Sequence, residues 1–140
     1  MKPKILSSFG EKVWLHLHFN DGFSFIALQD EKKAVGIISV NWRYMNPPLN
    51  NTREAYIDII EVHKDFRKNG IASKLVDLTA KYARRQGAHQ LRAWSSYDKI
   101  EALHMWRKLG FGLVPTVEEE SKVEGYYVTY QLAQNRSPAY

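Results

Sequence analysis

The residues from 60 to 73 have the types and the order that suit the binding of a phosphate group. An apolar predicted strand ends at Val62, a cationic stretch follows, and Gly70 precedes a predicted helix. The first turn of a helix has N–H groups without partners inside the helix, and the helix dipole adds positive charge there. A glycine lets phosphate oxygens approach those N–H groups closely. The sequence therefore predicts an anion cradle made by Arg67, Lys68, Asn69, Gly70, Ile71, Ala72 and Ser73.

The strand that leads into this cradle also carries a carboxylate that could act as a general base. Side chains alternate between the faces of a strand, which predicts one face with Glu54, Tyr56, Asp58, Ile60 and Val62 and another with Ala55, Ile57, Ile59 and Glu61. A carboxylate in an otherwise apolar strand is costly unless it has a partner, so Asp58 has a reason to be functional. We expect it to remove a proton through a water molecule. The alternative is a structural aspartate held by hydrogen bonds at the rim of the sheet.

The charge of the chain is unevenly distributed. The net charge is +5, but residues 63 to 92 hold eight basic and two acidic side chains, a local balance of +6 (8 − 2). Residues 118 to 124 hold four glutamates and one lysine. The basic stretch suits an anion such as a diphosphate, and the acidic stretch could attract a cationic amine. The alternatives are solvated surfaces for both and, for the basic stretch, a domain that binds nucleic acid.

Residues that would indicate other chemistry are few. The chain has no cysteine, which excludes disulfides, thiolate nucleophiles and cysteine-ligated metal sites. His16 and His18 share a face of a predicted strand, but two ligands do not make a metal site, and we expect none. No apolar run reaches the roughly 20 residues that span a membrane, and the first residues lack the pattern of a secretion signal. We therefore expect a cytoplasmic protein without a membrane partner.

The elements expected to position these residues follow from hydrophobic periodicity. Alternation of period two predicts strands, the first two paired as a hairpin, at 12–19, 23–28, 34–44, 55–62, 90–94, 112–117 and 126–132. Helical spacing predicts one helix at 71–86 and a second from a capping box at 98–101 to just before Gly110. The length suits a single domain, which we assign to 1–133, with a frayed tail at 134–140. This order predicts an α+β fold with a mixed, mainly antiparallel sheet flanked by helices.

The segments 67–72 and 102–111 form a pair of motifs. The first reads Arg-x-x-Gly-x-Ala after a strand that ends in valine, and the second reads Ala-x-x-x-aromatic-x-x-x-Gly-Phe. In this order and at this spacing, the pair resembles the acetyl-coenzyme A signature and the second motif of the GCN5-related N-acetyltransferases (GNAT family). The resemblance runs from about residue 34 to residue 132 and is strongest between the two motifs.

The resemblance implies an acyl-CoA N-acyltransferase fold that uses acetyl-CoA as a cosubstrate. The backbone of Ile60 and Val62 would hydrogen-bond the pantetheine arm in a gap where two strands splay apart. Residues 67 to 73 would wrap the diphosphate. Lys99 and Trp106 stand at two further positions expected to contact the coenzyme.

The resemblance also implies a route for the reaction. A primary amine of a small molecule or a peptide would attack the thioester directly in a ternary complex, without an acyl-enzyme. The Val62 backbone N–H would stabilise the developing oxyanion, and Asp58 shares the face on which family members often carry a carboxylate near the acceptor nitrogen. The alternatives are a protein that binds coenzyme A without catalysis and a basic module for nucleic acid, of which we do not expect the latter.

Two features depart from the family pattern. Trp106 stands where many members have a tyrosine that protonates the leaving thiolate, and an indole cannot do so. The N-terminal part has predicted strands where family members have helices that roof the acceptor site, so we expect a shortened helical part. The roof would then be missing, or come from the loop 46–52 or a second subunit, which favours a homodimer because apolar sheet would otherwise be exposed.

Overall fold

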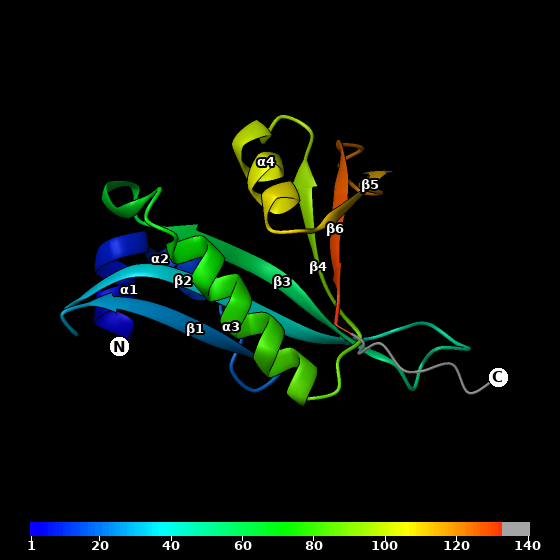
Figure 1. Cartoon of the computed structure of the whole chain (residues 1–140), viewed down its shortest axis with the longest axis horizontal. Helices are drawn as coiled ribbons and strands as arrows, with labels where there is room; N and C mark the ends of the chain where they lie inside the picture. The colour runs from blue at the N-terminus through cyan, green and yellow to red at the C-terminus, as the bar shows by residue number, and fades with distance from the viewer. Residues whose placement is uncertain (133–140) are drawn as a thin grey trace.

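A computed structural model of the chain describes residues 1–132, and a single sheet of six strands runs through it (Figure 1). The elements are, in chain order, α1 (Lys2–Phe9), α2 (Glu11–Leu15), β1 (Gly22–Gln29), β2 (Lys33–Tyr44), β3 (Arg53–Val62), the 3₁₀ turn η1 (Lys64–Phe66), α3 (Ile71–Arg85), β4 (Gln90–Ser96), α4 (Ile100–Lys108), β5 (Gly112–Val117) and β6 (Glu124–Gln131). The tail predicted at 134–140 lies outside the described residues.

The sheet consists of two antiparallel halves joined by a short parallel contact. The strand order is β1-β2-β3-β4-β6-β5, and every neighbouring pair is antiparallel except β3 and β4. These two strands pair only at Ala55 with Leu91 and at Tyr56 with Arg92. Beyond these pairs β3 and β4 diverge, and the two halves of the sheet form a V in Figure 1. The predicted mixed, mainly antiparallel α+β fold is confirmed.

Helices cover both faces of the first half of the sheet. The apolar face of α3, including Leu75, Val76 and Ala83, packs with α4 and the inner residues of β2, β3, β4 and β6 in the main core. On the opposite face, Ile5 of α1 and Val13 of α2 pack against Ile37 of β2 in a smaller core. The strand β3 is thus held between two layers of helices along the edge that borders the V.

The strand predicted at 12–19 is wrong, because this part of the chain is helical. Gly10, at a φ of 87°, separates α1 from α2. It lies between Ile5 and Val13, which pack in the same core, and so interrupts the helical pattern to which both belong. The alternating residues that suggested a strand are not equally buried: Val13 is 8% exposed, whereas Leu15 is 72% and Phe19 57% exposed. The expected missing roof is therefore also wrong, because α1 and α2 lie over this face of the sheet.

Most other predicted elements are confirmed, with two corrections. The first strand, β1, pairs with β2 rather than with residues 12–19. The second predicted helix is present as α4, but the predicted capping box is not formed, because the carboxylate of Asp98 accepts a hydrogen bond from Ser96 Oγ at 2.6 Å. Among the described residues, no helix has both the length and the apolar composition needed to cross a bilayer.

Candidate functional site

The gap between β3 and β4 is bordered by main-chain groups of β3. His63 donates its backbone N–H to the Val35 carbonyl of β2 at 2.9 Å. Successive residues of an extended chain direct their N–H and C=O groups to opposite edges of the strand. The groups of Val62 and, two residues earlier, of Ile60 therefore point to the edge that borders the gap. Val62 and Ile60 thus lie where the sequence predicted an added strand-like ligand to bind.

The predicted anion cradle lies at the same end of β3. Gly70 adopts a φ of 78° and is the N-cap residue of α3, and no side chain of residues 1–132 makes a capping hydrogen bond there. A Cβ atom at Gly70 would meet nothing within 4 Å, so the space above the first turn is open. Arg67 Nε donates to the Val62 carbonyl at 3.1 Å, and Asn69 Nδ2 donates to the Phe66 carbonyl at 3.1 Å. These contacts fix the loop with its positive charges beside the first turn of α3.

The closed end of the V is held by an ion pair between the two strands. Glu54 of β3 is 1% exposed and lies against the guanidinium of Arg92 on β4, with Nε to Oε1 at 2.9 Å. Gln90 Nε2 donates to the other carboxylate oxygen at 2.8 Å. Burial raises the pKa of Glu54, but the hydrogen bonds from Arg92 and Gln90 outweigh it, and the net pKa lies below 4.5. The geometry of the gap therefore depends on the charged form of Glu54.

Replacement of Glu54 by Ala should destabilise the fold by about 2 kcal/mol, or roughly 8 °C in Tm. The loss stays below that of a fully buried pair because the Arg92 side chain is 22% exposed and water can reach it. Because the folded pKa of Glu54 is depressed, its contribution is present above pH 4.5 and lost on acidification. Glu54→Gln should accordingly flatten the acid limb of stability measured by chemical denaturation. Equal stability of Glu54→Ala and wild type would contradict the role of the pair.

Asp58 lies at a β-bulge, which changes the predicted faces of β3. Ser39 of β2 pairs with Ile59, and the next residue, Val40, pairs with Ile57, so Asp58 is the extra residue. After the bulge, Ile59 packs in the smaller core beneath α1 and α2, and Ile60 packs in the main core. The predicted alternation is therefore wrong for Ile59 and Ile60, which exchange faces. A bulge of this kind redirects a side chain, and bulges occur often beside active sites.

The side chain of Asp58 contacts His18, a residue of the loop between α2 and β1. Nε2 of His18 lies 2.8 Å from Asp58 Oδ2, and Nδ1 lies 2.9 Å from Asp21 Oδ2. Burial lowers the pKa of His18, but the hydrogen bonds to the two carboxylates outweigh it and raise the pKa above 6.5. The hydrogen bond from His18 in turn lowers the pKa of Asp21. Neither of these two contacts follows from the sequence pattern, because a strand at 12–19 would place His18 on one face together with His16.

The two histidines do not form a pair. His16 is exposed, and its Nδ1 lies 2.8 Å from the Lys12 carbonyl of α2. Within residues 1–132, no group of three or more histidine, cysteine, aspartate or glutamate side chains could hold a metal ion. His18 instead contacts Asp58 and Asp21.

The other predicted contact residues lie on the β4 side of the gap. Lys99 is exposed and immediately precedes α4. Trp106 is 4% exposed in the main core, and its ring packs on Phe111 with a centroid separation of 4.8 Å. Ser73, which ends the predicted cradle, lines a hollow of about 150 Å³ beside α3. Trp106 is therefore a core residue of α4, whereas Lys99 is exposed and Ser73, a residue of α3, lines a separate hollow.

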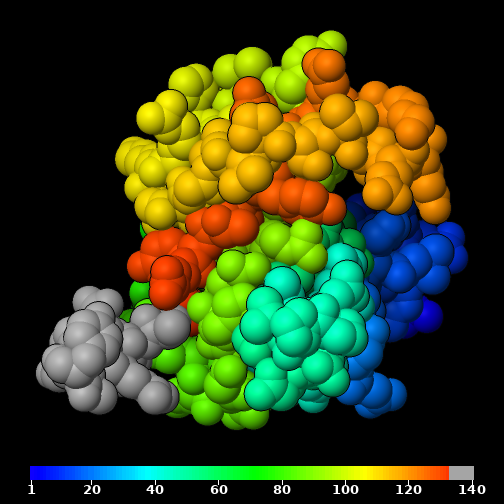
Figure 2. All heavy atoms as spheres, turned by 90° about the vertical axis from the view of Figure 1, so that its right-hand side faces the viewer, coloured from blue at the N-terminus to red at the C-terminus, as the bar shows by residue number. Residues whose placement is uncertain are grey.

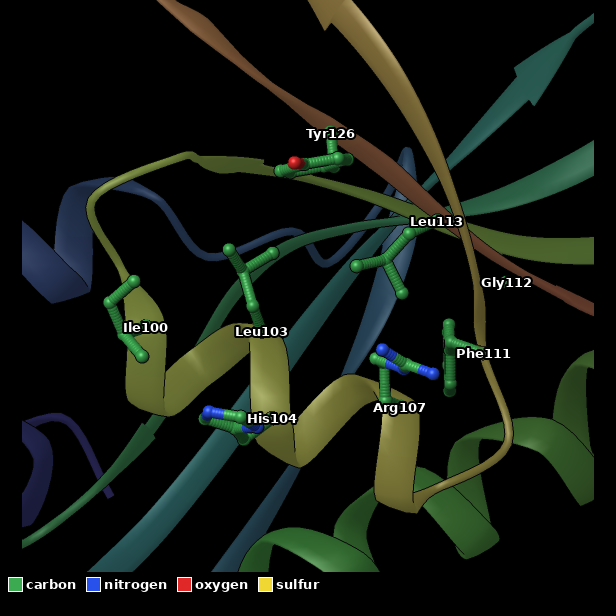
Figure 3. Close-up of a pocket in the computed structure, with 8 residues that line it drawn as sticks. All are labelled: Ile100, Leu103, His104, Arg107, Phe111, Gly112, Leu113 and Tyr126. Atoms are coloured by element: carbon green, nitrogen blue, oxygen red, sulfur yellow. The ribbon is translucent and has the colours of Figure 1, made fainter.

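A larger cavity of about 590 Å³ lies between α4 and β5, away from the gap (Figure 3). Leu103, Leu113 and Tyr126 line it together with the cationic Arg107. None of its lining residues belongs to β3 or to the loop 63–70.

Two loops that the sequence associated with the acceptor belong neither to β3 nor to the predicted cradle. The loop 46–52 joins β2 to β3 at the closed end of the V and projects from that end (turquoise in Figure 2), so it does not roof the open gap. The glutamate-rich turn joins β5 to β6, and Glu118 accepts hydrogen bonds from Ser121. These bonds lower the pKa of Glu118. Glu119 and Glu120 are exposed, as a solvated loop requires.

Known proteins are similar to this chain in sequence. The model of the acetyltransferase (GNAT) family matches residues 4–111. An uncharacterized N-acetyltransferase of Methanocaldococcus jannaschii is 26% identical over 113 residues, which are 81% of this chain and 46% of that protein. N-alpha-acetyltransferase 30 of Schizosaccharomyces pombe is 26% identical over 89 residues, which are 64% of this chain and 57% of that protein. The chain spans about half the length of these curated relatives.

A solved structure supports the fold independently of close sequence similarity. A chain of the NatC complex bound to Gag peptide and CoA matches with a TM-score of 0.69 at 17% identity, covering 79% of this chain and 71% of that chain. At this identity the match is evidence for the fold alone.

Proposed function

The chain belongs to the acetyltransferase (GNAT) family, and from this premise we propose that it is an N-acetyltransferase that moves an acetyl group from acetyl-CoA to a primary amine. The observation that carries the proposal is the position of the cradle at the open end of the gap. A strand edge at which the main-chain groups of Ile60 and the N–H of Val62 face the gap lies beside a helix terminus without a side-chain cap, and the loop 63–70 joins the two. One elongated ligand with an amide arm and a diphosphate fits both.

The coenzyme would be held by groups that the fold directs into this gap. The N–H and C=O groups of Ile60 and the N–H of Val62 would bind the pantetheine arm as an added strand, in place of the missing pairing with β4. The amides of residues 69 to 73 would bind the diphosphate, and Arg67 and Lys68 would neutralise its charge. Lys99, which precedes α4, would border the coenzyme, whereas Trp106 would act only through the core packing of α4. The bound coenzyme supplies an activated acetyl group.

The chain itself would supply positioning, a base and an oxyanion donor. The backbone N–H of Val62 points to the gap and can donate to the carbonyl oxygen as negative charge develops there. Asp58, four residues earlier on the same strand, can take a proton from the incoming ammonium, directly or through water. The amine would then attack in a ternary complex, because both ligands share one gap.

The acceptor class supported by the fold is a primary amine of a small molecule or a peptide. The curated relatives are named N-acetyltransferases, and the NatC structure contains a peptide. A homodimer stays a prediction, but its original reason is gone, because α1 and α2 cover the sheet face that was expected to be exposed.

Acetyl-CoA should raise the Tm of the chain by several degrees at about 100 times its Kd, a stabilisation of about 2.7 kcal/mol. Differential scanning fluorimetry measures this directly. A duplex DNA or an RNA at moderate salt should produce no comparable shift, because screening weakens contacts that are only electrostatic. The opposite pattern would favour the basic nucleic-acid module.

Thiol release in the presence of an amine separates transfer from binding alone. Purified chain, acetyl-CoA and a panel of alkylamines and peptides with free N-termini should release coenzyme A faster than any amine-free control. Binding of acetyl-CoA without release by any of these amines would support the alternative of a coenzyme-binding protein that lacks catalysis.

A further inference from the structure

His18 is held rigidly at the point where β3 bulges. Its backbone N–H donates to Ser39 Oγ at 2.7 Å, and its carbonyl accepts from Ser24 Oγ at 3.0 Å. Ser39 is fully buried and pairs with Ile59, the residue that follows the bulge. The loop that carries His18 is therefore fastened to β1 and β2 directly opposite Asp58. The imidazole position is set by the fold rather than by its two side-chain contacts alone.

The ring of His18 lies between a carboxylate near the gap and a carboxylate in solvent. The His18 side chain is 15% exposed, that of Asp58 32% and that of Asp21 62%. Within residues 1–132, the charges that act on the ring are those of Asp21, from its own loop, and Asp58, from β3. The groups that β1 and β2 bring to His18, Ser24 and Ser39, are uncharged. The three side chains form a continuous path from the bulge to the surface.

A path of this kind solves a problem of proton transfer. An ammonium group has to lose a proton before its nitrogen can attack. The pKa is about 10.4 for an alkylammonium, about 4 for a carboxylic acid and about 6.5 for an imidazolium. Transfer to a carboxylate alone is thus opposed by more than six powers of ten, whereas transfer to an imidazole is opposed by about four. A base with a pKa near the operating pH is the more effective acceptor.

On the premise of the proposed acetyl transfer, we propose that His18 acts through Asp58 as a positioning residue that receives the proton lost by the acceptor ammonium. An N–H bond of the ammonium breaks and an O–H bond forms at Asp58. The proton then passes from Asp58 to Nε2 of His18, which leaves an ionised Asp58 and an imidazolium. The amine nitrogen keeps the electron pair with which it attacks, and no electrons are exchanged with another group.

Asp21 has a separate part in this arrangement. By accepting the N–H of Nδ1, it leaves Nε2 of neutral His18 without a hydrogen, so that the proton taken from the ammonium comes to lie in the 2.8 Å contact between Asp58 Oδ2 and Nε2 and completes that hydrogen bond. Together with Asp58 it raises the pKa of His18, which makes the imidazole a better acceptor. Since only neutral His18 can take the proton, the transfer rate should fall as the pH drops through this raised pKa. Removal of the Asp21 charge should lower the pKa and move that limb to lower pH.

The test is the pH profile of acetyl transfer in matched variants. In Asp21→Asn the acid limb of kcat/KM for the amine should move down by about half a unit to one unit, as expected for loss of one adjacent charge. In His18→Gln the limb should disappear and kcat should fall at least tenfold, while KM for acetyl-CoA stays unchanged. His16→Gln, which removes an exposed histidine of the same loop, should behave as wild type. NMR titration of the imidazole nitrogens would report the pKa of His18 independently of activity.

Each outcome decides the inference. It is supported when the NMR pKa of His18 and the acid limb move together in Asp21→Asn. It is overturned if, in Asp21→Asn, the acid limb stays in place while the NMR pKa of His18 falls, or if that pKa does not fall. It is also overturned if His18→Gln keeps the acid limb and the rate of the wild type. If the wild-type chain transfers acetyl groups but the acid limb of Asp21→Asn stays in place, this inference alone is refuted. If the wild-type chain shows no transfer at all, the proposed function is refuted as well.

Discussion

Replacement of Gly70 by Glu should abolish the thermal shift that acetyl-CoA produces, with at least a hundredfold loss of affinity. The new side chain would enter the open space above the first turn of α3, because a Cβ at Gly70 meets nothing within 4 Å. Its carboxylate would lie against the site proposed for the diphosphate. Like charges at this range cost several kcal/mol, and each 1.4 kcal/mol is a factor of ten in affinity. Isothermal calorimetry and the thermal shift would both measure the loss.

A matched control separates charge at the cradle from backbone strain. Gly87 follows the other end of α3 at a φ of 86°, and a Cβ there also meets nothing within 4 Å. Gly87→Glu should therefore lose similar stability, since both changes place a side chain in the left-handed region, but it should bind acetyl-CoA as wild type does. Full affinity in Gly70→Glu would mean that the diphosphate is bound elsewhere.

The turn proposed as the cradle could be predicted from the sequence because its signal is local. A strand, a cationic loop and a glycine before a helix stand in consecutive residues, and Gly70 adopts the positive φ that such a turn favours. The strand and helix order around it is equally local, so β2 to β6, α3 and α4 were predicted with small errors at their ends. The family resemblance rested on the same segments and was confirmed.

Asp58 could be singled out from the sequence, but its bulge and its contact with His18 could not, because their geometry is not local. The bulge at Asp58 arises from the register between β2 and β3, which no single strand reveals. His18 contacts Asp58 across 40 residues of chain, and its loop was interpreted as a strand because Val13 and Leu15 alternate with polar residues. That interpretation overlooked the helical spacing of Ile5 and Val13 across Gly10. Long-range pairing thus determines which residues contact Asp58.

Replacement of Asp58 by Asn should lower kcat about a hundredfold to a thousandfold, within the range of general-base contributions. Asn is nearly isosteric and can still hydrogen-bond His18, so the loop between α2 and β1 should keep its place. It cannot accept the proton of the ammonium. KM for acetyl-CoA should stay unchanged because the coenzyme is proposed to contact the backbone of β3 and the cradle. Steady-state kinetics with a saturating amine measures both parameters.

Glu61 provides the control within the same strand. It lies three residues after Asp58, carries the same charge in a longer side chain, and is half-buried. Glu61→Gln should retain kcat, because it removes a negative charge from the same strand but leaves the proposed proton acceptor at residue 58 in place. If both variants lose activity to the same extent, the effect is the general potential of β3 rather than a base at residue 58. If Asp58→Asn alone retains activity, the proton leaves by another route.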